Sequence, residues 1–168
     1  MTISIVTGGA GFIGSHIVEE LKRLDHMVVV IDNEYSDNDN FHWRRDTLNV
    51  NADITDYKTL KKAFTGADYV FHLAAEARIG PSIENPVNAL NINTIGTCNV
   101  LQCAREVGAK KVLYSSTSSG YGLNEAPNVE TQPDDCLNPY SVSKIAGEKL
   151  CKMYTDLYGL KTIVFRYF

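Results

Sequence analysis

Six short runs of apolar, mostly β-branched residues recur along the chain and show no alternation with polar residues. Runs of this kind indicate strands that are buried on both faces, which is typical of a parallel sheet. The six predicted strands are Ile3–Thr7, Met27–Ile31, Leu48–Asn51, Tyr69–Leu73, Lys111–Ser115 and Lys161–Tyr167.

Segments with a helical spacing of apolar residues separate most of these strands. The predicted helices are Phe12–Leu24, Tyr57–Phe64, Pro86–Val107 and Pro139–Tyr158. The alternation predicts an α/β fold, a doubly wound parallel sheet of the Rossmann type with the strand order 3-2-1-4-5-6. We expect residues 1–168 to form one such domain. Two polar segments, Asn33–Asp46 and Pro127–Pro139, are expected to be surface loops.

A glycine-rich turn follows the first predicted strand. Gly8, Gly11 and Gly14 are spaced three residues apart, and a helical segment begins within the turn. Glycines at this spacing allow a tight turn, a close approach of the backbone to a pyrophosphate, and close packing of helix on strand. The helix N-terminus would then offer unpaired N–H groups to the phosphates. The pattern indicates a dinucleotide site, and a simple glycine-rich turn is the alternative.

Asp32 ends the second predicted strand, about 20 residues after the glycine turn, where a carboxylate can bind the adenosine ribose hydroxyls. Asn33 and Glu34 follow, and neither is a cation that could pair with a 2′-phosphate. NAD is therefore favoured over NADP. Asp53 and Ile54, after the third strand, are expected to flank the adenine, although a turn or helix-capping role fits Asp53 equally well.

Tyr140 and Lys144 lie four residues apart at the start of a predicted helix, so their side chains stack on one face. A nearby ammonium stabilises a phenolate and lowers its pKa. Tyr57 and Lys61 repeat this spacing and are expected to form a solvated helix face. Only the first pair follows a serine- and threonine-rich strand end, in which Thr117 could bind a substrate oxygen; a polar turn is the alternative there.

Composition narrows the possible partners. The chain is 44% hydrophobic and 21% charged, with a net charge of -4. An acidic protein without a basic cluster is not expected to bind nucleic acid, and no apolar run reaches the roughly 20 residues of a membrane span. The cysteines and histidines show no metal-ligand spacing. Together with a start that has no basic n-region, this predicts a cytoplasmic protein without a structural metal.

These motifs together resemble the amino-terminal half of extended short-chain dehydrogenases/reductases of the nucleotide-sugar epimerase/dehydratase group. The resemblance also rests on His72-Leu73-Ala74-Ala75, Asn93-x-x-Gly96-Thr97, Tyr121-Gly122 and Arg166-Tyr167-Phe168. It implies bound NAD, with Tyr140 as the base, Thr117 as its hydrogen-bonding partner and Lys144 on the nicotinamide ribose. The cofactor residues that it implies are Gly8, Gly11, Phe12, Ile13, Gly14, Asp32, Asn33, Asp53, Ile54, Leu73, Ala74, Ala75, Asn93, Ser115, Tyr140, Lys144 and Phe168.

Ser118 and Ser119 distinguish between members of that group. Dehydratases of the family carry Asp-Glu directly after the catalytic threonine, and serines cannot replace that acid and base. The chain therefore resembles the UDP-glucose 4-epimerase type, which oxidises a UDP-hexose at C4, rotates the keto sugar and reduces it again. The alternatives are an NAD-binding module without turnover, and a dehydratase or decarboxylase relative. Family members continue into a second substrate domain, so we expect this chain to be truncated and its activity impaired.

Two opposed apolar stripes on the predicted helix 86–107 suggest a homodimer. One stripe covers the sheet, and a monomer would leave the other exposed. Pairing this helix with the helix 139–158 across a twofold axis would bury it, as the resemblance also implies. The stripes are Val87, Leu90, Cys98 and Leu101, and Ala89, Ile92, Gly96, Val100, Cys103 and Val107. The expected test is Val100→Glu, which should yield a monomer.

Overall fold

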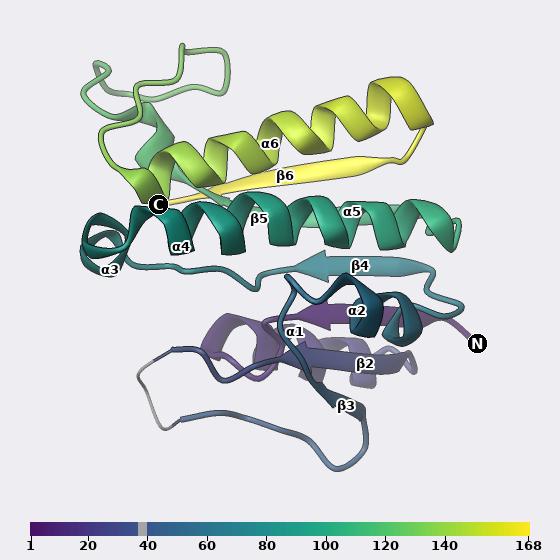
Figure 1. Cartoon of the computed structure of the whole chain (residues 1–168). Helices are drawn as coiled ribbons and strands as arrows, with labels where there is room; N and C mark the ends of the chain where they lie inside the picture. The colour runs from purple at the N-terminus through teal and green to yellow at the C-terminus, as the bar shows by residue number, and fades with distance from the viewer. Residues whose placement is uncertain (37–39) are drawn as a thin grey trace.

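The computed structural model describes residues 1–36 and 40–168 and contains a six-stranded parallel sheet (Figure 1). The strands lie in the order β3-β2-β1-β4-β5-β6, which confirms the predicted doubly wound topology. Residues 37–39 of the predicted loop Asn33–Asp46 lie outside the described residues. The strands are β1 (Ile3–Thr7), β2 (Met27–Asp32), β3 (Leu48–Asn51), β4 (Tyr69–His72), β5 (Lys111–Thr117) and β6 (Thr162–Tyr167).

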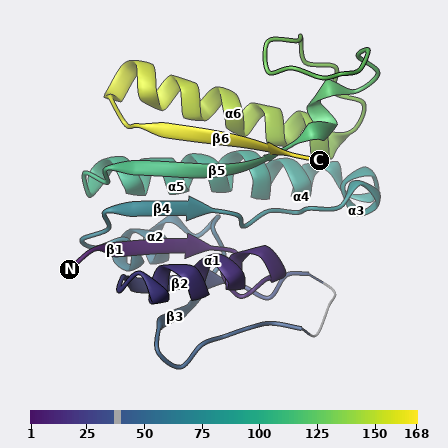
Figure 2. The ribbon, with the colours of Figure 1, turned by 180° about the vertical axis from the view of Figure 1, so that it is seen from behind.

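Helices pack on both faces of the sheet, and each face has its own apolar core. α1 (Phe12–Arg23) lies on one face, where Val6, Val18 and Val30 belong to the core beneath it. α2 (Tyr57–Ala63), α5 (Thr97–Glu106) and α6 (Pro139–Tyr158) lie on the other face (Figures 1 and 2). Ile5 and Val29 point to that second core, because successive side chains of a strand point to opposite faces.

The long helix predicted at 86–107 is present and contains one irregular turn. After α3 (Ile79–Glu84), the structure contains α4 (Pro86–Leu90), a π-helical turn at Asn91–Gly96, and then α5, with helical backbone throughout. The Asn85 side chain caps α4 by accepting a hydrogen bond from the Asn88 backbone N–H. At the π-helical turn Gly96 presses on Ile54, since a Cβ at residue 96 would lie 2.6 Å from the Ile54 side chain. The π-helical turn, which lies at this tertiary contact, was not predicted.

The predicted division of that helix into two stripes is wrong in part. Leu101 and Val100, predicted on opposite stripes, are both 0% exposed in the core beneath α5. The exposed apolar side chains are instead Val87, Leu90 and Ile95. Val100→Glu would therefore disrupt the core rather than test a dimer.

Local sequence signals fix both ends of α6 at the predicted residues. Asn138 and Ser141 form a reciprocal capping box, with Pro139 in the first turn, and this arrangement pairs N–H groups that a helix start leaves free. Gly159 ends the helix with φ 71°, a left-handed conformation that glycine adopts without strain. The helix therefore begins one residue before Tyr140 and fixes where that side chain enters the site.

One face of the sheet is partly bare. Within the described residues no helix covers β4, β5 and β6 on the side of α1 (Figure 2). Phe165 and Tyr167 of β6 are 40% and 42% exposed there, with their rings stacked in parallel. A shallow apolar groove beside them is lined by Ile17, Phe71, Leu73, Leu113, Ser115, Phe165 and Tyr167. No helix in the part of the chain that is described has the length and apolar character to cross a membrane.

Candidate functional site

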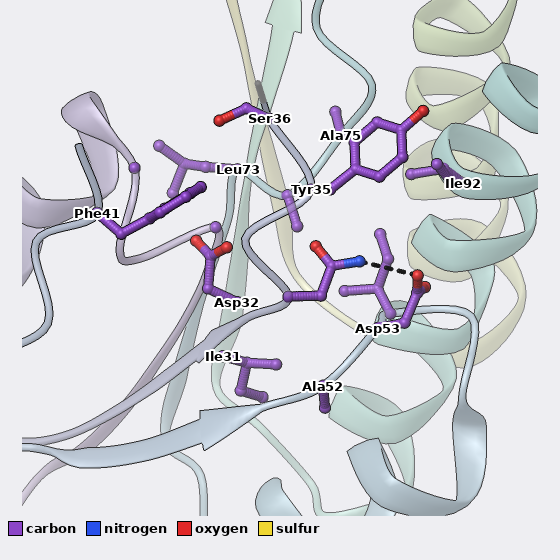
Figure 3. Close-up of a pocket in the computed structure, with 15 residues that line it drawn as sticks. Ile31, Asp32, Tyr35, Ser36, Phe41, Ala52, Asp53, Leu73, Ala75 and Ile92 are labelled. Atoms are coloured by element: carbon purple, nitrogen blue, oxygen red, sulfur yellow. Dashed lines mark hydrogen bonds between the residues drawn. The ribbon is translucent and has the colours of Figure 1, made fainter. Parts of the chain in front are cut away.

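A pocket opens at the carboxyl ends of β1, β2, β3 and β4 (Figure 3). Parallel strands all point to the same edge of the sheet, so the residues that follow them meet there. The pocket brings together nine of the predicted cofactor residues, which are Gly8, Gly11, Asp32, Asn33, Asp53, Ile54, Leu73, Ala74 and Ala75. Segments up to 67 positions apart in the chain thus form the one cavity that the motifs predicted.

The glycine turn is as tight as its sequence indicates. Gly8 has φ 70°, and a Cβ there would lie 2.7 Å from the Ala74 backbone nitrogen. A Cβ on Gly14 would lie 2.1 Å from the Gly8 carbonyl oxygen, so the start of α1 packs directly on the turn. Gly11 is less crowded, because a Cβ at that residue would make only a van der Waals contact, 3.4 Å from the Gly8 carbonyl oxygen. Gly8 and Gly14 are needed for packing, and Gly11 leaves room for a ligand.

Acidic and amide side chains line the pocket beside the glycine turn. Asp32 accepts hydrogen bonds from the backbone N–H groups of Ala10 (3.1 Å) and Glu34 (2.9 Å), which orient its carboxylate into the pocket (Figure 3). Asn33 donates from Nδ2 to the Asp53 Oδ2 at 2.9 Å, the dashed line in Figure 3. Each Asp32 oxygen keeps a free lone pair, so the carboxylate can still accept hydrogen bonds from two ribose hydroxyls.

Two aromatic side chains of the pocket were not predicted. Tyr35 and Phe41 line it from the loop after β2, with Ser36 between them in the sequence (Figure 3). Asn88 of α4 donates a hydrogen bond to the Tyr35 hydroxyl at 2.8 Å, which holds the ring beside the cavity. The sequence signal that could have found them is the presence of aromatic residues in an otherwise polar, acidic loop. Aromatic side chains usually pack against other residues or a ligand.

Thr117, Tyr140 and Lys144 come from β5 and α6, which pack together. β5 extends two residues beyond its predicted end because Ser116 and Thr117 pair with Arg166 and Tyr167 of β6. Thr117 therefore stands at the end of the strand, where its hydroxyl accepts a hydrogen bond from the Ser119 N–H at 3.0 Å. Tyr140 lies in the first turn of α6, half-buried, and Lys144 follows one turn later.

Lys144 is buried, with 4% of its surface exposed. Burial lowers its pKa to about 8 from 10.5, because a low-dielectric interior disfavours the ammonium form. Glu148, the nearest carboxylate along α6, is held by Arg166, whose Nη2 and Nε donate to it at 2.7 and 2.9 Å. The ammonium therefore remains available to a neighbouring phenolate or hydroxyl.

The second Tyr–Lys pair has a different environment. The Tyr57 hydroxyl donates to Glu106 at 2.5 Å, and Lys61 pairs with the same carboxylate at 2.9 Å. These bonds lower the pKa of Glu106 to about 2 and raise the pKa of Tyr57. A tyrosine that is kept protonated by a carboxylate cannot act as a base at neutral pH, so this pair serves as a control for Tyr140 and Lys144.

The remaining predicted cofactor residues lie outside the pocket lining. Phe12 and Ile13 are exposed in the first turn of α1. Ser115 lines the bare-face groove, and Phe168 stacks on Tyr121 at the end of the chain. Asn93 is 1% exposed and bonds internally, to both backbone groups of Glu76 and to the Ser143 hydroxyl. Asn93 thus clamps the segment after β4 to α6, and its contact with a cofactor stays a prediction.

The pocket fits a dinucleotide chemically. Gly11, the N-cap of α1, makes no side-chain capping bond, so the helix start can offer N–H groups to an anion. An acceptor carboxylate, Asp32, and the apolar Ile31 and Ile92 line the same cavity, which suits a ribose and a flat base. Among residues 1–36 and 40–168 no three His, Cys, Asp or Glu side chains are grouped to hold a metal ion.

Comparison with known proteins finds one family for nearly the whole chain. A model of the NAD dependent epimerase/dehydratase family matches residues 4–168. The UDP-glucose 4-epimerase of Lacticaseibacillus casei is 36% identical, over 100% of this chain and 51% of that protein. The UDP-N-acetyl-alpha-D-glucosaminuronate decarboxylase of Bacillus cytotoxicus is 37% identical, over 98% of this chain and 53% of that protein. The chain spans about half the length of these curated relatives.

Solved structures agree with this result. A UDP-glucose 4-epimerase of Thermotoga maritima, crystallised with UDP-glucose, superposes with a TM-score of 0.94 at 35% identity, over 99% of this chain and 55% of that one. The Thermus thermophilus UDP-glucose 4-epimerase in complex with NAD gives a TM-score of 0.91 at 34% identity, with the same coverage.

Proposed function

The chain belongs to the NAD-dependent epimerase/dehydratase family, whose cofactor is NAD, and we propose that it is the cofactor half of a UDP-hexose 4-epimerase. The proposal has two parts, a binding function at the pocket and a proton-transfer function at Thr117, Tyr140 and Lys144. The relatives that support the substrate class are epimerases of UDP-glucose, one of them crystallised with that sugar nucleotide.

The pocket residues support the proposed binding function. Gly8 and Gly11 would lie against the pyrophosphate, Asp32 would accept hydrogen bonds from the adenosine ribose, and Asp53 with Ile54 would flank the adenine. Asn33 and Glu34, beside Asp32, bring no positive charge to a 2′-phosphate. When bound, NAD supplies the acceptor that takes a hydride from the sugar carbon and later returns it.

The proton is handled by side chains of this chain. Tyr140, as phenolate, accepts the proton of the C4 hydroxyl and returns it to C4 oxygen after the sugar has turned its other face. The Lys144 ammonium, one helical turn away, stabilises the phenolate between these two steps. Thr117 stands at the end of β5, where its hydroxyl can donate to the same sugar oxygen.

A single observation favours epimerisation over removal of water. Ser118 and Ser119 follow Thr117 where dehydratases of the family need an acid and a base. Glu148 cannot replace them, because its carboxylate accepts hydrogen bonds from Ser116 and Arg166. The described site therefore holds a proton acceptor for C4 and lacks, near Thr117, a second pair for elimination. Because one of the relatives is a decarboxylase, decarboxylation of a UDP-sugar acid is the second candidate function.

The test is incubation of the protein with NAD and UDP-galactose, with the formation of UDP-glucose and of reduced cofactor as readouts. Tyr140→Phe should lower conversion by at least roughly 10²-fold, whereas Tyr57→Phe, in the second Tyr–Lys pair, should not change it. Cofactor binding without conversion or reduction would indicate a binding module. Release of carbon dioxide from a UDP-sugar acid would indicate the decarboxylase. Cytoplasmic location stays a prediction.

We also propose a homodimer through α4–α5 and α6. Val87, Ile95 and Leu157 are 76%, 52% and 68% exposed on these helices and on the π-helical turn between α4 and α5, and a dimer interface would cover them. Light scattering should report about twice 18.6 kDa. Leu157→Glu should reduce the mass to that of a monomer, and Leu123→Glu, at an 82% exposed loop position, should not. A wild-type monomer at tens of micromolar would contradict the proposal.

A further inference from the structure

Lys144 is a buried lysine, and no carboxylate of the described residues forms an ion pair with its ammonium. The described ion pairs of α6 join Glu148 to Arg166, Lys149 to Asp134, and Lys152 to Asp156. Burying an unpaired ammonium favours loss of its proton. Something in the interior must therefore offset this cost if the residue is to serve the site as a cation.

The ring of Tyr114 lies under this ammonium. The Lys144 Nζ is 4.4 Å from the centroid of the ring, within the range of a cation–π interaction. Tyr114 belongs to β5 and is 0% exposed, so water does not weaken the contact. Its hydroxyl donates to the Lys144 carbonyl oxygen at 3.2 Å. One side chain thus contacts both the backbone and the charged end of Lys144.

The surrounding residues fix the ring in this position. Gly147 of α6 leaves the space that the ring occupies, since a Cβ there would lie 2.2 Å from the Tyr114 hydroxyl oxygen and 2.6 Å from Cζ. His72 of β4 also packs on the ring, with 5.5 Å between ring centroids. His72 is itself held by hydrogen bonds to Thr7 (2.7 Å) and Thr97 (2.8 Å). The ring therefore cannot turn away without disturbing α6 and β4.

We infer that Tyr114 is a positioning residue for Lys144, and that the face of its ring keeps the ammonium charged and directed at the crevice. The inference rests on the proposed function, in which Lys144 stabilises the Tyr140 phenolate. It also explains why α6 carries a glycine one turn after its lysine, at a position where alanine would suit a helix better.

The other titratable groups around Lys144 do not replace the ring. From β4, His72 is neutral, because burial lowers its pKa to about 3. On α6, burial raises the pKa of Cys151 to about 12, so it is a neutral thiol. The charge of Glu148 raises the pKa of Lys144, but its carboxylate is paired with Arg166 and does not contact the ammonium. Tyr140 lies one turn before Lys144 and is the group whose phenolate the ammonium would stabilise. The face of the Tyr114 ring is therefore the direct contact that favours the ammonium form of Lys144.

The experiment changes the electron density on the face of the ring while keeping an aromatic ring at residue 114. Phenylalanine at residue 114 removes only the hydroxyl, and pentafluorophenylalanine also withdraws charge from the ring face. The Lys144 Nζ is titrated by NMR in the cofactor-free chain of 168 residues, labelled on lysine, with Lys144→Arg to assign the signal. We expect Tyr114→Phe to leave the pKa of Lys144 within about 0.3 of its value, and the fluorinated ring to lower it by about one pH unit.

Pentafluorophenylalanine at Tyr69, whose ring centroid lies 5.9 Å from the Lys110 Nζ, is the matched control and should not move the Lys144 signal. An unchanged pKa with the fluorinated ring at residue 114 would overturn the inference. An equal shift with phenylalanine would also overturn it, because the hydroxyl would then be responsible. The titration needs no sugar and no turnover, so its failure is separate from failure of the proposed function, which would show as conversion that persists in Tyr140→Phe.

Discussion

Two alanine substitutions in the glycine turn should separate packing from binding. Gly14→Ala places a methyl group 2.1 Å from the Gly8 carbonyl oxygen and 2.7 Å from the Gly9 Cα. Both are backbone atoms, so α1 must move away from β1. Overpacking of this kind costs about 1–3 kcal/mol. For a chain of this size each kcal/mol lowers Tm by roughly 2–4 °C, so Tm should fall by about 4–8 °C at the middle of that range.

Gly11→Ala should act on the ligand alone. Gly11 has φ -73°, which any residue can adopt, and a methyl group there meets nothing closer than 3.4 Å. The unfolding free energy should therefore change by less than about 0.5 kcal/mol. The same methyl group would fill part of the space left for the pyrophosphate and would hold it away from the backbone N–H groups. If one charge-assisted hydrogen bond is lost in this way, the cost is about 1.5–3 kcal/mol, which weakens NAD binding by roughly 10- to 150-fold.

Thermal unfolding and NAD calorimetry on the two variants give the comparison. Gly80→Ala is the control, because a methyl group on that helical residue has nothing within 4 Å; it should raise stability by about 0.5–1 kcal/mol and leave NAD binding unchanged. If Gly14→Ala unfolds at the wild-type temperature, the packing argument is wrong. If Gly11→Ala binds NAD at wild-type affinity, this turn does not hold the pyrophosphate.

Three further predictions concern single polar residues. Asp32→Ala should weaken NAD binding by about 1–2 kcal/mol, measured by calorimetry, and equal affinity of the wild type for NADP would contradict the assignment of Asp32. His72 has its pKa lowered to about 3 from 6.5, so the unfolded state binds its proton first. The contribution of this group to the free energy of unfolding should be complete above pH 6.5 and should decrease as the pH falls toward 3, by up to about 1.4 kcal/mol per pH unit. Urea unfolding at a series of pH values measures this dependence, and the prediction is wrong if His72→Gln shows the same pH dependence as the wild type. Lys144→Met should stabilise the fold by up to roughly 3 kcal/mol at neutral pH, because the pKa of Lys144 is lowered to about 8 from 10.5, and a lower Tm would refute it.

The features that could be predicted from the sequence are determined within one segment or by a general rule of parallel sheets. The bounds of α6 follow from its capping residues Asn138 and Gly159. The strand order is that of the doubly wound fold, which alternating strands and helices predict. Gly8 and Asp32 could be assigned to one pocket because the carboxyl ends of parallel strands always meet. None of these features depends on which distant side chains touch.

The features that were missed depend on contacts between distant segments. The π-helical turn at Asn91–Gly96 lies where Gly96 meets Ile54, 42 positions away. The burial of Val100 on a helix with two apolar stripes depends on which stripe the sheet selects. Tyr35 joins the pocket through its hydrogen bond with Asn88 of α4. Helical periodicity contains no information about partners at this distance.

The bare face on β6 has a consequence for how the chain associates with itself. β6 is one of the two edge strands of the described sheet, and β3 is the other; Phe165 and Tyr167 are partly exposed on its bare face. Pairing of β6 with β3 of a second copy is open-ended, since each added molecule presents a new edge. A twofold contact through α6 is closed and stops at two copies. Mass should therefore reach a plateau with concentration if the helices associate, and keep rising if β6 pairs with β3.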